Sequence, residues 1–324
     1  MRTIAIEEHF TTPMYRANVP ANEFRNFYLT SRSGQLGHDI VAQLADLGAE
    51  RIARMDAAGV DVQVLSFGSP GPQAFAPDLA VPMARDANDL AFEAVKAHPQ
   101  RFAAFAALPT SAPEAAAEEL ERCVAKLGFK GAMISGHTNG EFIDLKKYWG
   151  IFERAEALDV PIYLHPGIPH PAAVELYLKD YPIMIGAGWG FGMETATQTV
   201  RLIYSGIFDQ HPKLRIILGH LGEGIPFLLW RANWVHRFMG KDMGLKREFA
   251  DYFRENFWIT TSGNFSQPAL MCCLMELGVE RVMFSVDWPY NKNTDGVKFI
   301  ENAPISPADK RKIFSENAAQ VLKL

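Results

Sequence analysis

The chain has 324 residues, of which 48% are hydrophobic and 21% charged, and its 32 Lys and Arg against 37 Asp and Glu give a formal net charge of −5. This composition is typical of a folded globular protein and excludes an intrinsically disordered chain. The mild acidity, without any block of basic residues, argues against partners such as nucleic acid or an anionic membrane, and no apolar run approaches the roughly 18 residues of a membrane span.

Short apolar runs typical of buried parallel strands alternate along the chain with longer amphipathic runs typical of helices. Strands are expected at residues 3–9, 62–67, 102–108, 130–135, 161–165, 214–218, 257–262 and 281–286. Helices are expected at residues 40–58, 79–97, 113–127, 146–158, 191–208, 225–238, 268–277 and 307–324. Prolines at the expected helix starts and glycines just after several helix ends support these boundaries.

Eight strands, each followed by a helix, predict an α/β protein with the fold of a (β/α)8 TIM barrel. A doubly wound open sheet is the alternative, but no GxGxxG motif follows the first strand. Without internal repeats or a linker, residues 1–324 are expected to form a single domain. Two long insertions, 10–39 after the first strand and 165–190 after the fifth, fall on the side where barrel enzymes carry their active sites.

The cysteines and the first residues indicate the compartment. Cys123, Cys272 and Cys273 lack the spacing of a zinc site or a disulfide framework, so we expect free thiols in a reducing compartment. The opening MRTIAIEEHF carries charged residues where a secretory leader needs an apolar run. We therefore expect a cytoplasmic protein.

Five side chains able to bind a divalent metal follow or end four of the predicted strands. Glu7 and His9 lie two residues apart on the first strand and should share one face. His165 ends the fifth strand, His220 follows the sixth, and Asp287 follows the eighth. Each alone could be a loop residue or a helix cap, but their joint occurrence at the carboxyl ends of barrel strands predicts an active site.

Several segments carry a resemblance to a known family. They are AIEEHF, RFAAFAALP, ELERCVAKLGFKGA, LDVPIYLHP, LRIILGHLGEGIPFLLWR, DYFRENFWITTSGNF and FSVDWPY. Together they resemble the amidohydrolase superfamily, in its branch of metal-dependent, non-oxidative aromatic acid decarboxylases that includes γ-resorcylate (2,6-dihydroxybenzoate) and 2,3-dihydroxybenzoate decarboxylases. The superfamily generally has His–x–His on the first strand, whereas this branch has Glu–x–His, as here.

The resemblance implies one divalent metal ion per chain, bound by Glu7, His9, His165 and Asp287. Two imidazoles and two carboxylates are compatible with either Zn²⁺ or Mn²⁺, and the residue types do not choose between them.

Catalytic roles are also implied. Asp287 would act as the general acid that protonates the ring carbon losing its carboxylate, assisted by His220 and Glu223. A carboxylate three residues after a histidine can fix its tautomer and orientation. The alternative for His220 and Glu223 is the start of a helix, where an acid in the first turn is favourable in any case.

The substrate, an aromatic carboxylate, would be bound by four further residues: Arg231, Tyr290, Phe10 and Trp189. The aromatic side chains would wall a pocket for a planar ring. Where this chain has Tyr290, close relatives often have phenylalanine, which leaves the substituents of the arene open.

Assembly is expected as well. In the family, the arginine matching Arg231 reaches into the pocket of a neighbouring subunit, which implies a homodimer or a homotetramer. The first insertion adds the apolar Phe24, Phe27 and Tyr28, which a monomer would be expected to cover.

Three functions are compatible with these observations. The first is decarboxylation of a hydroxybenzoate, with release of CO2 and a phenol. The second is a hydrolase of the same superfamily acting on a lactone or ester, and the third is a binder of small molecules without catalysis. Glu7 in place of a first-strand histidine favours the decarboxylase over the hydrolase, and the five intact site residues disfavour the binder.

Overall fold

The computed structural model describes residues 2–19, 33, 34, 37 and 39–324. Its strands all pair in parallel, in the order of the chain, as two sheets, β1-β2-β3 and β4-β5-β6-β7-β8-β9. They are β1 (Ile4–Phe10), β2 (Val62–Phe67), β3 (Phe102–Ala104), β4 (Ala106–Ala107), β5 (Ala132–Ser135), β6 (Ile162–His165), β7 (Ile216–Leu218), β8 (Phe257–Thr260) and β9 (Val282–Met283).

The two sheets join into a ring. β3 and β4 are one extended run, the expected strand 102–108, interrupted only at Phe105, whose N–H donates to the carbonyl of Leu65 at 2.9 Å. The other seam lies between β1 and the segment after β9, where Glu8 and Trp288 form a single parallel bridge. There the N–H of His9 donates to the Trp288 carbonyl at 2.7 Å. The expected ring of parallel strands within helices is confirmed.

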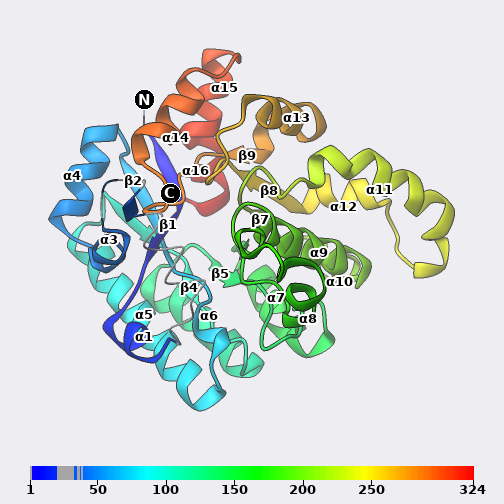
Figure 1. Cartoon of the computed structure of the whole chain (residues 1–324), viewed down its shortest axis with the longest axis horizontal. Coiled ribbons are helices and arrows are strands. Elements are labelled where there is room, and N and C mark those ends of the chain that lie inside the picture. The colour runs from blue at the N-terminus through cyan, green and yellow to red at the C-terminus, as the bar shows by residue number, and fades with distance from the viewer. Residues whose placement is uncertain (1, 20–32, 35–36, 38) are drawn as a thin grey trace.

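Helices surround this ring, as Figure 1 shows. They are α1 (Pro13–Asn18), α3 (Ile40–Ala45), α4 (Ala49–Ala58), α5 (Pro77–Ala97), α6 (Pro113–Leu127), α7 (Trp149–Ala157), α8 (Pro171–Ala173), α9 (Gly190–Tyr204), α10 (Ile207–Gln210), α11 (Ile225–Met239), α12 (Phe249–Asn256), α13 (Gln267–Leu277), α14 (Asn293–Glu301), α15 (Pro307–Arg311) and α16 (Asn317–Leu322). Short 3₁₀ or π turns occupy 72–74, 146–148, 174–178, 182–184, 241–243, 279–281 and 312–316.

Several helical segments differ from the sequence prediction. The expected helix 191–208 is α9 and α10, and the expected helix 307–324 is α15, a π turn and α16. The expected helix 40–58 is two helices, because the chain turns at Asp46, whose side chain accepts a hydrogen bond from the N–H of Gly48 at 2.8 Å. Helices α1, α8, α12 and α14 were not predicted. All four are short, and the apolar face of α12 continues directly into strand β8, so the sequence shows no separate helical period there.

The core has two parts. One part fills the barrel interior with side chains from around the ring and is completed by residues of α16. This interior cluster consists of Ile4, Ile6, Val62, Val64, Ala103, Phe105, Met133, Tyr163, Ile217, Met283, Ala318, Val321 and Leu322. A larger cluster packs the outer faces of the strands against the helices. This double layer fixes the carboxyl ends of the strands, where the predicted site lies.

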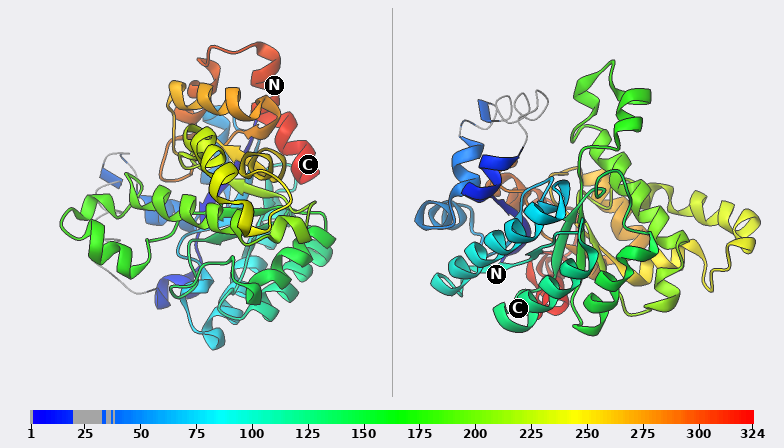
Figure 2. Two further views of the ribbon diagram at one scale, coloured as in Figure 1. Left: turned by 90° about the vertical axis from the view of Figure 1, so that its right-hand side faces the viewer. Right: turned by 90° about the horizontal axis from the view of Figure 1, so that it is seen from below.

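Other expectations on the chain can be compared with the structure. Cys123, Cys272 and Cys273 are all unpaired. None of the described helices is long and apolar enough to cross a membrane. Most of the first long connection, including Phe24, Phe27 and Tyr28, lies outside the described residues. The second runs between β6 and α9 and, like helix α11, projects from the barrel in Figure 2.

Candidate active site

A bulge in β1 turns Glu7 and His9 into the barrel mouth. The pairing of β1 with β2 shifts register between Ala5 and Glu8, so β1 has one extra residue there. Below the bulge Ile4 and Ile6 point into the barrel interior. Above it the inward positions are those of the predicted ligands, whereas Phe10 packs in the outer core.

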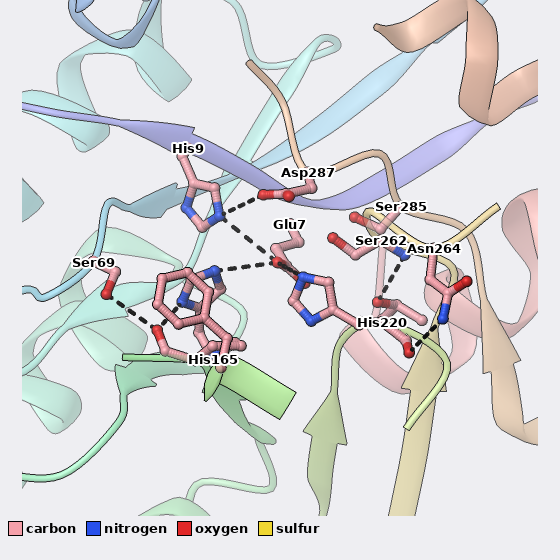
Figure 3. Close-up of polar contacts among 12 residues, drawn as sticks. Glu7, His9, Ser69, His165, His220, Ser262, Asn264, Ser285 and Asp287 are labelled. Atoms are coloured by element: carbon pink, nitrogen blue, oxygen red, sulfur yellow. Dashed lines mark hydrogen bonds and ion pairs between the residues drawn. The ribbon is translucent and has the colours of Figure 1, made fainter. Parts of the chain in front are cut away.

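Four predicted ligands come together at this mouth. One donor atom each from Glu7, His9, His165 and Asp287 lie within 4.8 Å of one another. Oε1 of Glu7 is 3.7 Å from Nε2 of His9 and 3.3 Å from Nε2 of His165. Oδ1 of Asp287 is 3.3 Å from Nε2 of His9. Figure 3 shows these side chains converging from β1, β6 and the segment after β9.

Hydrogen bonds outside the cluster orient its two histidines. Nδ1 of His165 donates to the carbonyl of Pro166 at 2.7 Å, which leaves the lone pair of its Nε2 directed at the cluster. Nδ1 of His9 contacts the hydroxyl of Ser66 at 3.1 Å. Both imidazoles therefore present Nε2 to the same point, as metal-ligating histidines do.

The second oxygen of Glu7 is held away from the cluster. Oε2 accepts a hydrogen bond from the hydroxyl of Tyr163, which also contacts the Thr260 hydroxyl at 2.9 Å. A Cβ at Gly219 would lie 2.8 Å from this same oxygen, so a larger residue there would displace the Glu7 carboxylate from this position. Sequence reasoning missed Tyr163, although a tyrosine two residues before a ligand on the same strand must share its face.

A divalent cation fits this cluster. Oε1 of Glu7 and Nε2 of His9 are both buried, and neither has a hydrogen-bond partner among the described residues. Such orphaned atoms are costly unless something binds them. Two imidazole nitrogens and two carboxylate oxygens form a donor set suited to Zn²⁺ or Mn²⁺, and a cation between them would satisfy both orphaned atoms.

Buried carboxylates and imidazoles face one another in the site and shift each other's pKa. Burial alone would raise the pKa of Glu7, but the imidazoles of His220, His165 and His9 outweigh it and hold that pKa well below its usual value. Burial alone would lower the pKa of His9, but Asp287 and Glu7 raise it to about 9. Glu7 is thus an ionised oxygen donor, ready for a cation.

His220 lies next to the four-residue cluster. Its Nδ1 is 2.7 Å from Oε1 of Glu223, and its Nε2 is 3.6 Å from Oε1 of Glu7. Against the opposing effect of burial, Glu223 and Glu7 raise the pKa of His220 to about 10. The pairing with Glu223 that the sequence predicted is therefore present in the structure.

The loop that carries His220 is not the start of a helix. His220, Leu221 and Glu223 have φ of +53°, +58° and +54°, and α11 begins only at Ile225. A run of left-handed residues of this kind is strained and is typical of functional sites. The alternative of Glu223 as a helix-capping residue is excluded, because its carboxylate binds His220 and α11 has no side-chain cap.

Asp287 also adopts a left-handed conformation, with φ of +70°. Its two oxygens have different surroundings: Oδ1 faces His9 at 3.3 Å, whereas Oδ2 accepts a hydrogen bond from Nδ2 of Asn291 at 3.3 Å. A Cβ at Gly263 would lie 3.1 Å from Oδ2 and 3.0 Å from Cδ2 of His220. The nearest helix, α14, begins at Asn293, so Asp287 is not its cap.

The accessible side of the site is the side of Asp287 and His220. Their side chains are 14% and 21% exposed, whereas those of Glu7 and His9 are fully buried. The donor cluster is therefore open to solvent on the side of these two groups.

The four predicted substrate-binding residues are scattered. The Tyr290 ring contacts the His9 ring edge-on, at 5.8 Å between centroids. Phe10 is 1% exposed and packs against Phe67, so the prediction that it walls the pocket is wrong: it lies on the outward face of β1. Trp189 is 59% exposed where α9 begins.

Arg231 lies on the exposed face of α11. Its guanidinium forms no hydrogen bond or ion pair with another described residue. Nothing within the described part of the chain brings it to the cluster of Glu7 and His9.

Glu8 was also missed. This carboxylate is completely buried between the two ligands of β1 and binds the segment that carries Asp287. Burial raises its pKa to about 7, although the backbone N–H groups of Val286 and Trp288 and the charge of Arg51 act in the opposite direction. A charged residue inside an apolar strand was the signal that could have identified it.

Comparison with known proteins agrees with this geometry. Residues 29–324 match the amidohydrolase family. A γ-resorcylate decarboxylase from Rhodococcus jostii is 41% identical over 99% of this chain and 98% of its own. A dihydroxybenzoic acid decarboxylase from Polaromonas sp., solved with manganese and the inhibitor 2-nitroresorcinol, has a TM-score of 0.89 at 39% identity, covering 100% and 97% of the two chains.

A second solved structure widens the range of substrates among the relatives. The 5-carboxyvanillate decarboxylase of Sphingomonas paucimobilis has a TM-score of 0.91 at 36% identity, covering 100% of this chain and 99% of its own. The family match and these full-length similarities agree with the donor cluster, whose first two residues follow the pattern Glu–x–His rather than His–x–His. The chain belongs to the amidohydrolase family, in its branch of metal-dependent aromatic acid decarboxylases.

Proposed function

We propose that this enzyme removes the carboxylate of a hydroxylated benzoate without oxidation, releasing CO2 and a phenol, with 2,6-dihydroxybenzoate as its substrate. The observation that carries the proposal is the cluster of Glu7, His9, His165 and Asp287, with the His220–Glu223 pair on its accessible side. The roughly 40% identity to γ-resorcylate decarboxylases over nearly the whole chain supports this substrate.

Glu7, His9, His165 and Asp287 would hold one divalent ion per chain. We propose Mn²⁺ as that ion, because the relative from Polaromonas sp. was solved with bound manganese. When bound, the ion supplies a Lewis-acidic positive charge that attracts the anionic end of the substrate.

The side chains around it would perform the proton transfer. Asp287 has one oxygen towards the cluster and the other towards Asn291, so Oδ2 is the atom that would hold the proton. The proton goes to the ring carbon that bears the carboxylate, and the electron pair of the breaking C–C bond restores aromaticity as CO2 leaves. His220, oriented by Glu223, would stabilise the negative charge beside Asp287.

Substrate binding would be completed across a subunit interface. Helix α11 carries a stripe of exposed apolar residues beside Arg231: Phe227, Trp230, Trp234 and Phe238, at 82%, 69%, 46% and 67% exposure. A monomer rarely leaves such a surface in water. We propose a two-fold homodimer, or a homotetramer of two dimers, in which the Arg231 guanidinium binds the substrate in the neighbouring site. Tyr290 would wall that site, and Trp189 would border it.

The remaining proposals concern the chain as a whole. We propose that it forms one barrel domain with long connections after β1 and β6, and that it works in the cytoplasm. A reducing compartment suits Cys123, Cys272 and Cys273, all of which are unpaired.

The test compares two classes of substrate. The manganese-loaded enzyme is incubated with 2,6-dihydroxybenzoate, 2,3-dihydroxybenzoate, salicylate and 5-carboxyvanillate, and separately with aryl esters and lactones. Release of CO2 with the matching phenol, fastest from 2,6-dihydroxybenzoate, is expected. Hydrolysis of the esters or lactones without any CO2 release would favour a hydrolase of the same family instead.

A further inference from the structure

The backbone on both sides of Asp287 is held by one buried side chain. Oε1 of Glu8 accepts hydrogen bonds from the Val286 N–H at 3.0 Å and the Ser285 hydroxyl at 3.1 Å. Oε2 accepts from the Trp288 N–H at 3.1 Å. The two carboxylate oxygens therefore fix the backbone N–H groups of the residue before and the residue after Asp287.

These hydrogen bonds lie beyond the end of strand β9, where the N–H groups of Gly263 and His9 bind the carbonyls of Val286 and Trp288 but not their N–H groups. Strand β9 ends at Met283, and the seam between it and β1 has no ladder, only the single bridge between Glu8 and Trp288. Asp287 has a φ of +70°. This conformation is strained in a non-glycine residue and persists only where the surrounding structure enforces it. With the N–H groups of both neighbours fixed by Glu8, Asp287 cannot relax to an ordinary conformation without breaking a buried hydrogen bond.

The buried Arg51 holds the backbone next to Glu8, although it forms no hydrogen bond or ion pair with Glu8 itself among the described residues. It acts on Glu8 electrostatically, and its guanidinium donates to the carbonyl of His9 at 2.9 Å and to Oε1 of Gln63 at 2.7 Å. The bulge in β1 explains the arrangement, because it turns Glu7 and His9 inward and leaves Glu8 facing the seam.

We infer that Glu8 is a positioning residue for proton transfer: its carboxylate holds Asp287 in the left-handed conformation in which Oδ1 faces the four-residue donor cluster and Oδ2, bound by Asn291, would carry the proton. Glu8 itself would bind neither the metal ion nor the substrate. The inference rests on the proposed role of Asp287 as the general acid. A misplacement of about 1 Å in such a group can cost about 10²-fold in rate.

The substitution Glu8→Gln tests this directly. It keeps the shape of the side chain but replaces one oxygen by an NH2 donor, so one of the two backbone N–H groups next to Asp287 faces a donor instead of an acceptor. We expect full manganese content, with a Kd within about 3-fold of the wild type, and little change in KM. We expect kcat to fall about 10²-fold, with a larger solvent deuterium isotope effect on kcat, because proton transfer becomes slower relative to the other steps.

Glu119→Gln is the matched control. Glu119 is another buried carboxylate, on α6, where it accepts from Asn88 at 2.8 Å and pairs with Arg122 at 2.7 Å. Its loss should lower the melting temperature while leaving kcat per bound metal and the isotope effect unchanged. Were Glu8→Gln to behave in the same way, Glu8 would be a structural residue only and the inference would be wrong.

Two other results would contradict the inference. One is a folded, metal-loaded Glu8→Gln enzyme with kcat within 2-fold of the wild type; the other is a loss of activity that tracks the loss of metal and is restored by excess Mn²⁺. If Glu8→Gln does not fold, Ser285→Ala removes the hydroxyl donor instead. It should lower kcat several-fold with a raised isotope effect, and an unchanged kcat and isotope effect would overturn the inference.

A crystal structure of the metal-loaded Glu8→Gln variant provides a readout that does not need activity. Asp287 should have left the left-handed region, and an unchanged φ and side-chain position would contradict the inference. This measurement distinguishes a failure of the inference on Glu8 from a failure of the proposed function. A wild-type enzyme that releases no CO2 from any benzoate contradicts the proposed function, whereas the backbone of Asp287 reports on Glu8 alone.

Discussion

Nδ1 of His220 is 2.7 Å from Oε1 of Glu223, and the opposite side of the same ring places Nε2 3.6 Å from Oε1 of Glu7. The pair thus lies between the four-residue donor cluster and the accessible side of the mouth, and it is not itself part of the donor cluster. This relationship separates residues that would bind the metal from residues that would act on the substrate, and the two groups respond differently to mutation.

His220→Asn should keep the metal and lose most of the rate. The amide still fills the space, but it cannot carry the positive charge of an imidazolium held by Glu223. We expect kcat to fall about 10²-fold or more, with metal content near one ion per chain by elemental analysis. Glu223→Gln should show a smaller fall of the same kind. Loss of metal from His220→Asn would make His220 a ligand.

His165→Ala should lose the metal. Its Nε2 is one of four donors, so we expect a weakening of the Mn²⁺ Kd beyond the roughly 10–100-fold that loss of an outer-shell partner costs. The matched control is His211→Ala, because His211 is also 6% exposed but pairs with Glu156 at 3.0 Å, away from the cluster. If both variants bound Mn²⁺ as tightly as the wild type, the ligand assignment would be wrong.

Glu194 makes the stability of the protein depend on pH. Burial raises the pKa of this carboxyl to about 7 from its ordinary value of 4.5, although the backbone N–H of His170 lowers it. Because the folded state holds the proton more tightly than the unfolded chain, the contribution of Glu194 to stability is complete below pH 4.5. It is lost as the pH rises through about 7.

Glu194→Gln should therefore stabilise the protein only at the higher pH. We expect its free energy of unfolding to exceed that of the wild type by about 1–3 kcal/mol at pH 8.5, and the two to coincide at pH 4. Denaturant unfolding of both proteins at the two pH values measures this. A difference that is the same at both pH values would show that Glu194 does not titrate as described.

Arg231 should act in the site of a neighbouring subunit. Asp287→Asn and Arg231→Ala are each expected to be inactive. In a mixed dimer one site carries both lesions and the other carries neither. Dissociating and re-associating an equal mixture should therefore restore about a quarter of the wild-type activity. If proven mixed dimers stayed inactive, Arg231 would act within its own subunit or outside the site.

The sequence predicted which residues form the site better than it predicted how the backbone directs them towards one another. The strand ends that carry His165, His220 and Asp287 followed from apolar runs bounded by polar residues, because parallel strands buried on both faces have that pattern. The bulge that turns Glu7 and His9 into the barrel mouth could not be predicted, since it depends on the register with β2, which the residue order does not reveal.

Phe10 shows why the face of a strand matters. Its place beside His9 indicated an aromatic wall, but the alternation of side chains directs it into the outer core against Phe67. Glu8 was missed for a related reason: the residue order does not show which face it occupies, and the fold brings it to the backbone of Val286 and Trp288.

The most direct test of the proposed chemistry is the fate of the ring carbon. The manganese-loaded enzyme is incubated with 2,6-dihydroxybenzoate in D2O, and CO2 and the aromatic product are measured together. We expect one CO2 per resorcinol, with a single deuterium at the carbon that carried the carboxylate, and no turnover by Asp287→Asn. Unchanged 2,6-dihydroxybenzoate, or equal turnover by the wild type and Asp287→Asn, would contradict it.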